Sequence, residues 1–160
     1  MKIIIRKLSI IVRRLKYLFR NYYYKSIFDV GDNTVFLGKV FFYHPHLIKI
    51  GNGCSINEGV FFNAGTSIII GNNVAISAGV FITSVGGKTG PSEIVEGKMP
   101  HHYGVVEIGE GSWLGANSII LNGVEIGKNC RISAGSVVNS NVKDNTVVVG
   151  NPARPSSIVR

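Results

Sequence analysis

Large aliphatic or aromatic residues recur every six positions along most of the chain, and the residue four places later is small or β-branched. A period of six fits neither an α-helix nor an alternating strand. It is typical of a parallel β-helix, in which three strands and three corners make a coil of roughly 18 residues. We therefore predict an all-β solenoid with inward-stacked ladders. The large ladder comprises Val30, Phe36, Phe42, Ile50, Ile56, Phe62, Ile70, Ile76, Ile82, Ile108, Leu114, Ile120, Ile126, Ile132 and Val138. The small one comprises Cys54, Val60, Thr66, Val74, Val80, Ser112, Ser118, Val124, Cys130, Ser136 and Val142.

The period breaks at one corner only. The steps from Phe42 to Ile50 and from Phe62 to Ile70 are eight residues, which predicts a bulge. At the same corner of the next coil, Ile82 is followed by Ile108, so a long loop of about residues 83–105 projects there. Long loops in compact domains are usually functional, so this loop is where we first expect chemistry.

Residues 1–28 form a separate region, ahead of a β-helix over residues 29–150 and a tail over residues 151–160. Apolar residues at Ile4, Leu8, Ile11, Leu15, Leu18, Phe19 and Tyr22 follow helical spacing, opposite a basic face. Two interpretations stay open: the helix lies on an anionic membrane surface through residues 1–25, or its apolar stripe caps the open end of the solenoid.

Charge separates the same region from the solenoid. The formal net charge is +8, and the first 25 residues contain eight basic residues and no acidic one. The remaining basic and acidic residues balance, so the basicity belongs to the helix. The basic residues accompany no recognisable nucleic-acid-binding module, and we expect no nucleic-acid partner.

The two cysteines, Cys54 and Cys130, occupy inward positions and are expected to fill the core without a disulfide. This favours a reducing compartment. We expect a cytoplasmic protein, placed on the inner face of the cell membrane if the helix binds lipid.

The later coils resemble the hexapeptide-repeat acyltransferases. The residues that carry the resemblance are Ile108–Ala116, Ile120–Gly127, Ile132–Val138 and Val149–Arg154. The basic helix and the layout are most similar to O-acetyltransferases of bacterial surface-polysaccharide synthesis. The resemblance implies a left-handed β-helix, a homotrimer with active sites between protomers, and acetyl transfer from acetyl-CoA to a sugar hydroxyl on a lipid- or nucleotide-linked acceptor. A histidine general base would take the hydroxyl proton.

Individual positions match the family's binding residues. Trp113, Ala116 and Ala134 fall where the family lines the acetyl-CoA groove, and Arg154 matches a cation near the nucleotide end. Asn63 matches a position that contacts the acceptor sugar. Each also has a structural alternative, such as corner geometry for the two alanines.

The family base is missing, because Gly87 stands at its position and Asn63–Ala64 stand at the position used by serine acetyltransferases. The loop returns to this corner through His101 and His102, so we predict His102, or else His101, as the base. Glu93 or Glu96 would orient the ring. His44 and His46, at the first bulge, are interpreted as structural or as acceptor contacts.

Three alternatives remain. The acceptor could be an amine, giving an N-acetyltransferase on an amino sugar. The chain could be a non-catalytic β-helix scaffold. It could also be a zinc hydratase of the γ-carbonic-anhydrase type, which shares the fold, but the four histidines form two clusters off the regular coil positions, and we expect no metal.

Overall fold

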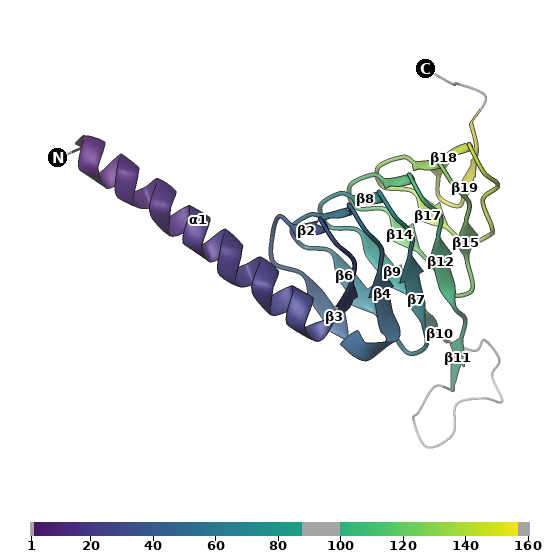
Figure 1. Ribbon diagram of the computed structural model, residues 1–160. Helices are drawn as coiled ribbons and strands as arrows, with labels where there is room; N and C mark the ends of the chain where they lie inside the picture. Colours follow the sequence, from purple (N-terminus) through teal and green to yellow (C-terminus); the bar gives the residue numbers. More distant parts are fainter. Residues whose placement is uncertain (1, 88–99, 157–160) are drawn as a thin grey trace.

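The computed structural model describes residues 2–87 and 100–156 and shows one helix followed by a parallel β-solenoid with three faces (Figure 1). The helix, α1, spans Lys2–Ile27. Each coil runs through the three faces in turn. The first face contains β1 (Asp29–Val30), β4 (Ile48–Ile50), β7 (Ile68–Ile70), β12 (Val106–Ile108) and β15 (Glu125–Ile126). The second contains β2 (Val35–Phe36), β5 (Ser55–Ile56), β8 (Ala75–Ile76), β13 (Trp113–Leu114), β16 (Arg131–Ile132), β18 (Val147–Gly150) and β19 (Ala153–Pro155). The third contains β3 (Phe41–Tyr43), β6 (Phe61–Asn63), β9 (Phe81–Thr83), β14 (Ile119–Ile120) and β17 (Val137–Val138).

The predicted inward ladders form the core. From Ile50 to Val138 every member of the large ladder is buried, and so are all small-ladder residues except Thr66. Thr66 lies at the bulged corner, where Ala64 and Ile68 are buried in its stead. Val30 and Phe42, in the first coil, are only partly buried. Parallel strands stack the same side-chain positions over one another, and this explains why a six-residue period produces a continuous apolar column.

The corners use residues that tolerate positive φ. Gly53, Asn73, Gly111 and Asn129 have φ between 54° and 71°. At the first bulged corner the extra residues form a 3₁₀ turn, Pro45–Leu47. The predicted bulge is confirmed.

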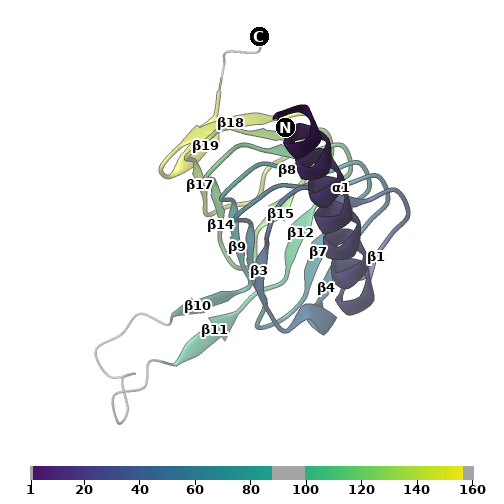
Figure 2. The same ribbon diagram turned by 90° about the vertical axis from the view of Figure 1, so that its left-hand side faces the viewer.

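The long insertion leaves the stack without disturbing it. Ile68 on β7 pairs directly with Val106 on β12, although residues 69–105 separate them in sequence. The ends of the insertion form an antiparallel pair, β10 (Val85–Gly87) and β11 (His101–Tyr103), which projects from the corner between the third and first faces (Figures 1 and 2). The expected projecting segment is confirmed, and its ends are strands.

Helix α1 caps the solenoid through polar side chains near its C-terminal end. The first coil has no upstream neighbour, so the backbone of β2 is open on that side. Asn21 accepts a hydrogen bond from the Phe36 N–H (2.7 Å) and donates one to the Phe36 carbonyl (3.1 Å), and Arg20 donates to the same carbonyl. The Tyr24 hydroxyl accepts from the Val40 N–H at 3.0 Å. These side chains take the place of a neighbouring strand at an edge.

The apolar stripe of α1 lies away from the solenoid. With 3.6 residues per turn, Leu15, Leu18, Phe19 and Tyr22 lie roughly opposite Tyr24 and Phe28, which are buried against the first coil. Phe19 is 72% exposed and Tyr22 78%. The cap interpretation is therefore right in part. The helix covers the open end of the solenoid, but it does so with the face opposite the apolar stripe. No helix within residues 2–87 and 100–156 has both the length and the apolarity required to cross a membrane.

Both cysteines are buried in the core as predicted. The Cys54 Sγ lies 3.1 Å from the Gly71 carbonyl oxygen. Burial raises the pKa of the Cys54 thiol, because the surrounding core disfavours a thiolate. Cys54 therefore acts as a small apolar residue that fills the ladder.

Candidate functional site

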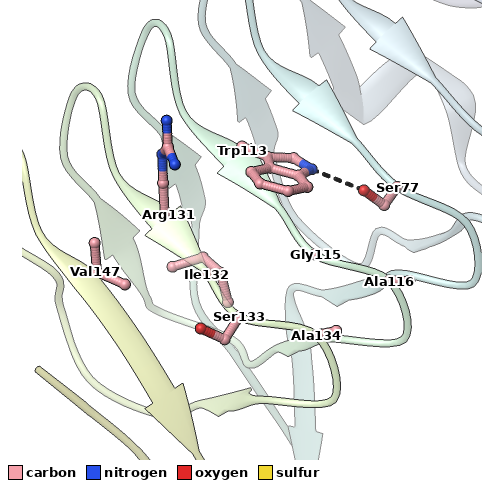
Figure 3. A pocket seen from close by; sticks show the side chains of 9 residues that line it. All are labelled: Ser77, Trp113, Gly115, Ala116, Arg131, Ile132, Ser133, Ala134 and Val147. Carbon is pink, nitrogen blue, oxygen red and sulfur yellow. Dashed lines mark hydrogen bonds between the residues drawn. The ribbon is translucent and has the colours of Figure 1, made fainter. Parts of the chain in front are cut away.

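An apolar groove of about 500 Å³ runs along the corner between the second and third faces (Figure 3). Gly115–Ala116 and Ser133–Ala134 form this corner in two successive coils, directly after β13 and β16. Because the residues at this corner are small, their side chains do not fill the groove between the flanking side chains. The predicted cofactor residues Trp113, Ala116 and Ala134 all line it. The complete lining is Ser77, Trp113, Gly115, Ala116, Arg131, Ile132, Ser133, Ala134 and Val147.

Trp113 forms one wall of this groove and is held on two sides. Its indole Nε1–H donates to the Ser77 Oγ at 2.8 Å, and the Arg131 guanidinium carbon lies 5.9 Å from its ring centre (Figure 3). Trp113 pairs in register with Ala75 and Arg131, so all three point outward from the second face. Sequence analysis missed Ser77 and Arg131. A step of one 18-residue coil from Trp113 would have identified Arg131.

The hairpin brings both candidate bases to the corner where the family base is missing. His101 pairs directly with Gly87, and His102 pairs with Gly86. Residues directly opposite in an antiparallel pair share a face, so His101 lies on the face that a Gly87 side chain would occupy, and His102 lies on the other. The predicted return of the loop to this corner is observed.

The two imidazoles have different partners. The His102 Nδ1 lies 2.7 Å from the side-chain nitrogen of Asn122, which belongs to the following coil. The His101 ring stacks on Tyr103 with centres 6.3 Å apart. Tyr103 in turn packs closely on Gly65 of the preceding coil. The hairpin is therefore fixed from both sides, and among residues 2–87 and 100–156 a polar partner that can orient the ring is found for His102 only.

Asn122 was not singled out from the sequence. An Asn side chain can present either its NH₂ or its oxygen to an imidazole. When the oxygen faces Nδ1, the Nδ1–H donates to it and Nε2 keeps its lone pair. This is the tautomer that a general base needs at Nε2.

Asn63, the predicted acceptor contact, lies at the same corner as the hairpin. It ends β6, pairs in register with Thr83, and donates from its side-chain nitrogen to the Thr83 Oγ at 3.1 Å. Thr83 Oγ in turn donates to the Val85 carbonyl at 2.8 Å, where β10 begins. Asn63 is thus linked to the base of the hairpin.

The structure does not bring all predicted residues together within one chain. The groove precedes the strands of the third face, whereas the hairpin and Asn122 follow them, so the third face separates Trp113 from His102. Arg154 lies elsewhere again, in a pocket of about 630 Å³ at the C-terminal end of the solenoid, beside Lys143 and Asn139.

The remaining candidates contribute less. Glu93 and Glu96 fall outside the described residues, so their predicted role in orienting the ring remains a prediction. His44 and His46 lie at the 3₁₀ turn of the first coil, with ring centres 6.0 Å apart. Within the described ranges, no three His, Cys, Asp or Glu side chains form a group that could hold a metal.

Comparison with known families matches the two halves of the solenoid separately. The family described as bacterial transferase hexapeptide (six repeats) matches residues 106–140, and the family described as hexapeptide repeat of succinyl-transferase matches residues 48–84. Both matches coincide with the stacked coils on either side of the insertion.

Individual relatives agree with these matches. A galactoside O-acetyltransferase of Lactococcus lactis is 53% identical over 47 residues, which are 29% of this chain and only 23% of that protein. The structure of a maltose O-acetyltransferase from Clostridium difficile covers 97% of this chain and 86% of its own, with 26% identity and a TM-score of 0.82. A hexapeptide-repeat acetyltransferase of Vibrio cholerae, complexed with acetyl coenzyme A, covers 82% of this chain and 72% of its own, with 26% identity and a TM-score of 0.77. The stacked coils are therefore similar to the hexapeptide-repeat acyltransferases, and the chain spans about a quarter of the length of the first curated relatives that it matches.

Proposed function

We propose that the protein is an acetyltransferase that moves the acetyl group of acetyl-CoA to a sugar hydroxyl in surface-polysaccharide synthesis. The observation that carries the proposal is the groove lined by Trp113, Ala116 and Ala134, at the positions where the family lines its acetyl-CoA groove. The acetyl-CoA complex of the Vibrio cholerae protein supports this choice of acyl donor.

His102 is the proposed general base. With its amide oxygen turned to Nδ1, Asn122 would orient the ring and leave the Nε2 lone pair for the acceptor hydroxyl, and such a base with an orienting partner is what an activated nucleophile requires. Nε2 takes the hydroxyl proton while the oxygen attacks the thioester carbonyl carbon. The tetrahedral oxyanion collapses, the C–S bond breaks, and the imidazolium returns the proton to the leaving sulfur.

The active site is proposed to form between protomers of a homotrimer. The third face separates the groove from the hairpin in one chain, so a second copy must bring its hairpin to the groove of the first. Symmetric closure gives each of three protomers one such site. Light scattering is expected to give about three times the chain mass of 17.3 kDa.

The acetyl-transfer proposal is tested by thiol release from acetyl-CoA in the presence of methyl glycosides or amino sugars. Thiol release that requires a hydroxyl acceptor supports O-acetylation, because acetyl transfer then leaves an ester. Release that requires a primary amine supports the N-acetyltransferase alternative, which the same machinery can serve. Binding of CoA without turnover on any acceptor would favour the scaffold alternative.

We expect Arg154→Gln to raise the KM for acetyl-CoA about tenfold, because a charge-assisted contact to phosphate is lost. Arg154 and Lys143 place two cations at the second pocket. Acetyl-pantetheine, which lacks the nucleotide, provides the comparison: its KM should not change in the variant. An equal rise for both donors would show that Arg154 does not contact the nucleotide end.

A further inference from the structure

Helix α1 presents an apolar stripe that nothing within the described residues covers. Leu8, Ile11, Leu15, Leu18, Phe19 and Tyr22 are each at least 48% exposed. They follow one side of the helix, whereas the capping contacts of Arg20, Asn21 and Tyr24 lie on the other. In Figure 1 the N-terminal part of the helix extends beyond the solenoid.

Basic side chains border the stripe on both sides. At 3.6 residues per turn, Lys16 falls next to one edge of the apolar sector, and Arg14 and Lys25 fall next to the other. All three are exposed. An apolar sector with basic residues at its edges is the arrangement by which a helix lies in a lipid interface, because long basic side chains reach the headgroups while the apolar residues enter the acyl boundary.

We propose that α1 docks the protein on an anionic lipid bilayer, with this stripe in the interface and Arg14, Lys16 and Lys25 at the headgroups. Charge complementarity selects this partner. The first 25 residues contain eight basic residues and no acidic one, so pairing the stripe with the α1 of a second copy would bring like charges together. Each of these basic residues is instead attracted to an anionic surface.

The polar cap explains how one helix does both tasks. The contacts of Arg20 and Asn21 with Phe36 and of Tyr24 with Val40 fix the C-terminal part of α1 to the first coil and leave the stripe facing outward. Docking therefore requires no unfolding of the cap, and it holds the solenoid beside the membrane at a set angle.

The test is flotation of the full chain with phosphatidylcholine vesicles, with and without phosphatidylglycerol. Wild type should bind only the anionic vesicles. Arg14→Gln/Lys16→Gln should weaken binding about 30-fold, since each basic residue near an anionic surface contributes about fivefold. Leu18→Gln/Phe19→Gln should weaken it about 100-fold. The matched control is Lys49→Gln/Lys128→Gln, which removes the same charge from exposed positions on the solenoid and should bind like wild type.

Each other outcome overturns the proposal. Equal binding to neutral and anionic vesicles, no binding to either, or a control that weakens as much as the helix variants would each do so. If Leu18→Gln/Phe19→Gln instead lowers the mass in solution and leaves vesicle binding unchanged, a second copy covers the stripe. Circular dichroism and melting curves check that these exposed substitutions leave the fold intact, and acetyl transfer to a soluble acceptor should not change.

Discussion

Replacing His102 by alanine is expected to lower kcat for acetyl transfer about 100- to 10,000-fold, the usual contribution of a general base. The KM for acetyl-CoA should change little, because His102 is not among the residues that line the groove proposed to seat the coenzyme. Steady-state kinetics of thiol release, with acetyl-CoA and acceptor varied in turn, measures both quantities.

His101→Ala is the matched control, because it removes a neighbouring imidazole from the other face of the same strand. It should retain most of the activity. A large loss in His101→Ala with little loss in His102→Ala would move the base to the side that faces Gly87. Little loss in either variant, and in the double variant, would exclude both histidines as the base.

The contact with Asn122 gives a second readout of the same assignment. In Asn122→Asp a carboxylate replaces the amide beside Nδ1, and its negative charge stabilises the imidazolium. A base must be neutral, so the acidic limb of the kcat–pH profile should move to higher pH. Asn122→Leu removes the polar partner of the ring and adds no negative charge, so it should lower kcat. If the profile does not move in Asn122→Asp, the contact between Asn122 and His102 takes no part in catalysis.

Ile68→Ala is expected to destabilise the solenoid by about 2–5 kcal/mol, because it opens a cavity in the inward ladder. Ile68 is fully buried on β7, at 0% exposure, and it pairs with both β4 and β12. Urea unfolding at a fixed protein concentration, followed by circular dichroism, gives the change in the free energy of unfolding.

The neighbouring residue provides the control. Ile69 lies on the same strand but is 38% exposed, so Ile69→Ala should cost less than about 1 kcal/mol. Similar destabilisation by both variants would mean that the outer surface of the first face contributes as much as the ladder does.

The six-residue period was sufficient to predict the architecture, because it shows which side chains face inward. It also located the insertion, because the long step from Ile82 to Ile108 interrupts the ladder at one corner. The handedness of the solenoid stays a prediction that rests on family resemblance. The groove residues Trp113, Ala116 and Ala134 were found by matching positions, and the structure places them together.

Other features depend on contacts between segments that no local pattern links. Ser77 and Trp113 are 36 residues apart, and the insertion between them breaks the regular step from one coil to the next. Asn122 meets His102 only because of the register of the hairpin. The amphipathic pattern of α1 also could not predict the orientation of the helix, because Asn21 and Tyr24, on the face opposite the apolar stripe, bond to the open backbone of the first coil at Phe36 and Val40.

The antiparallel closure at Val85–Gly87 and His101–Tyr103 separates two evolutionary constraints. Coils on either side pair as if nothing lay between them, so the sequence joining the two short strands can lengthen, shorten or be exchanged while the column beneath stays sealed. Proteins built this way can change the inserted sequence during evolution without changing the core, and an engineer can exchange such insertions between relatives without redesigning the scaffold.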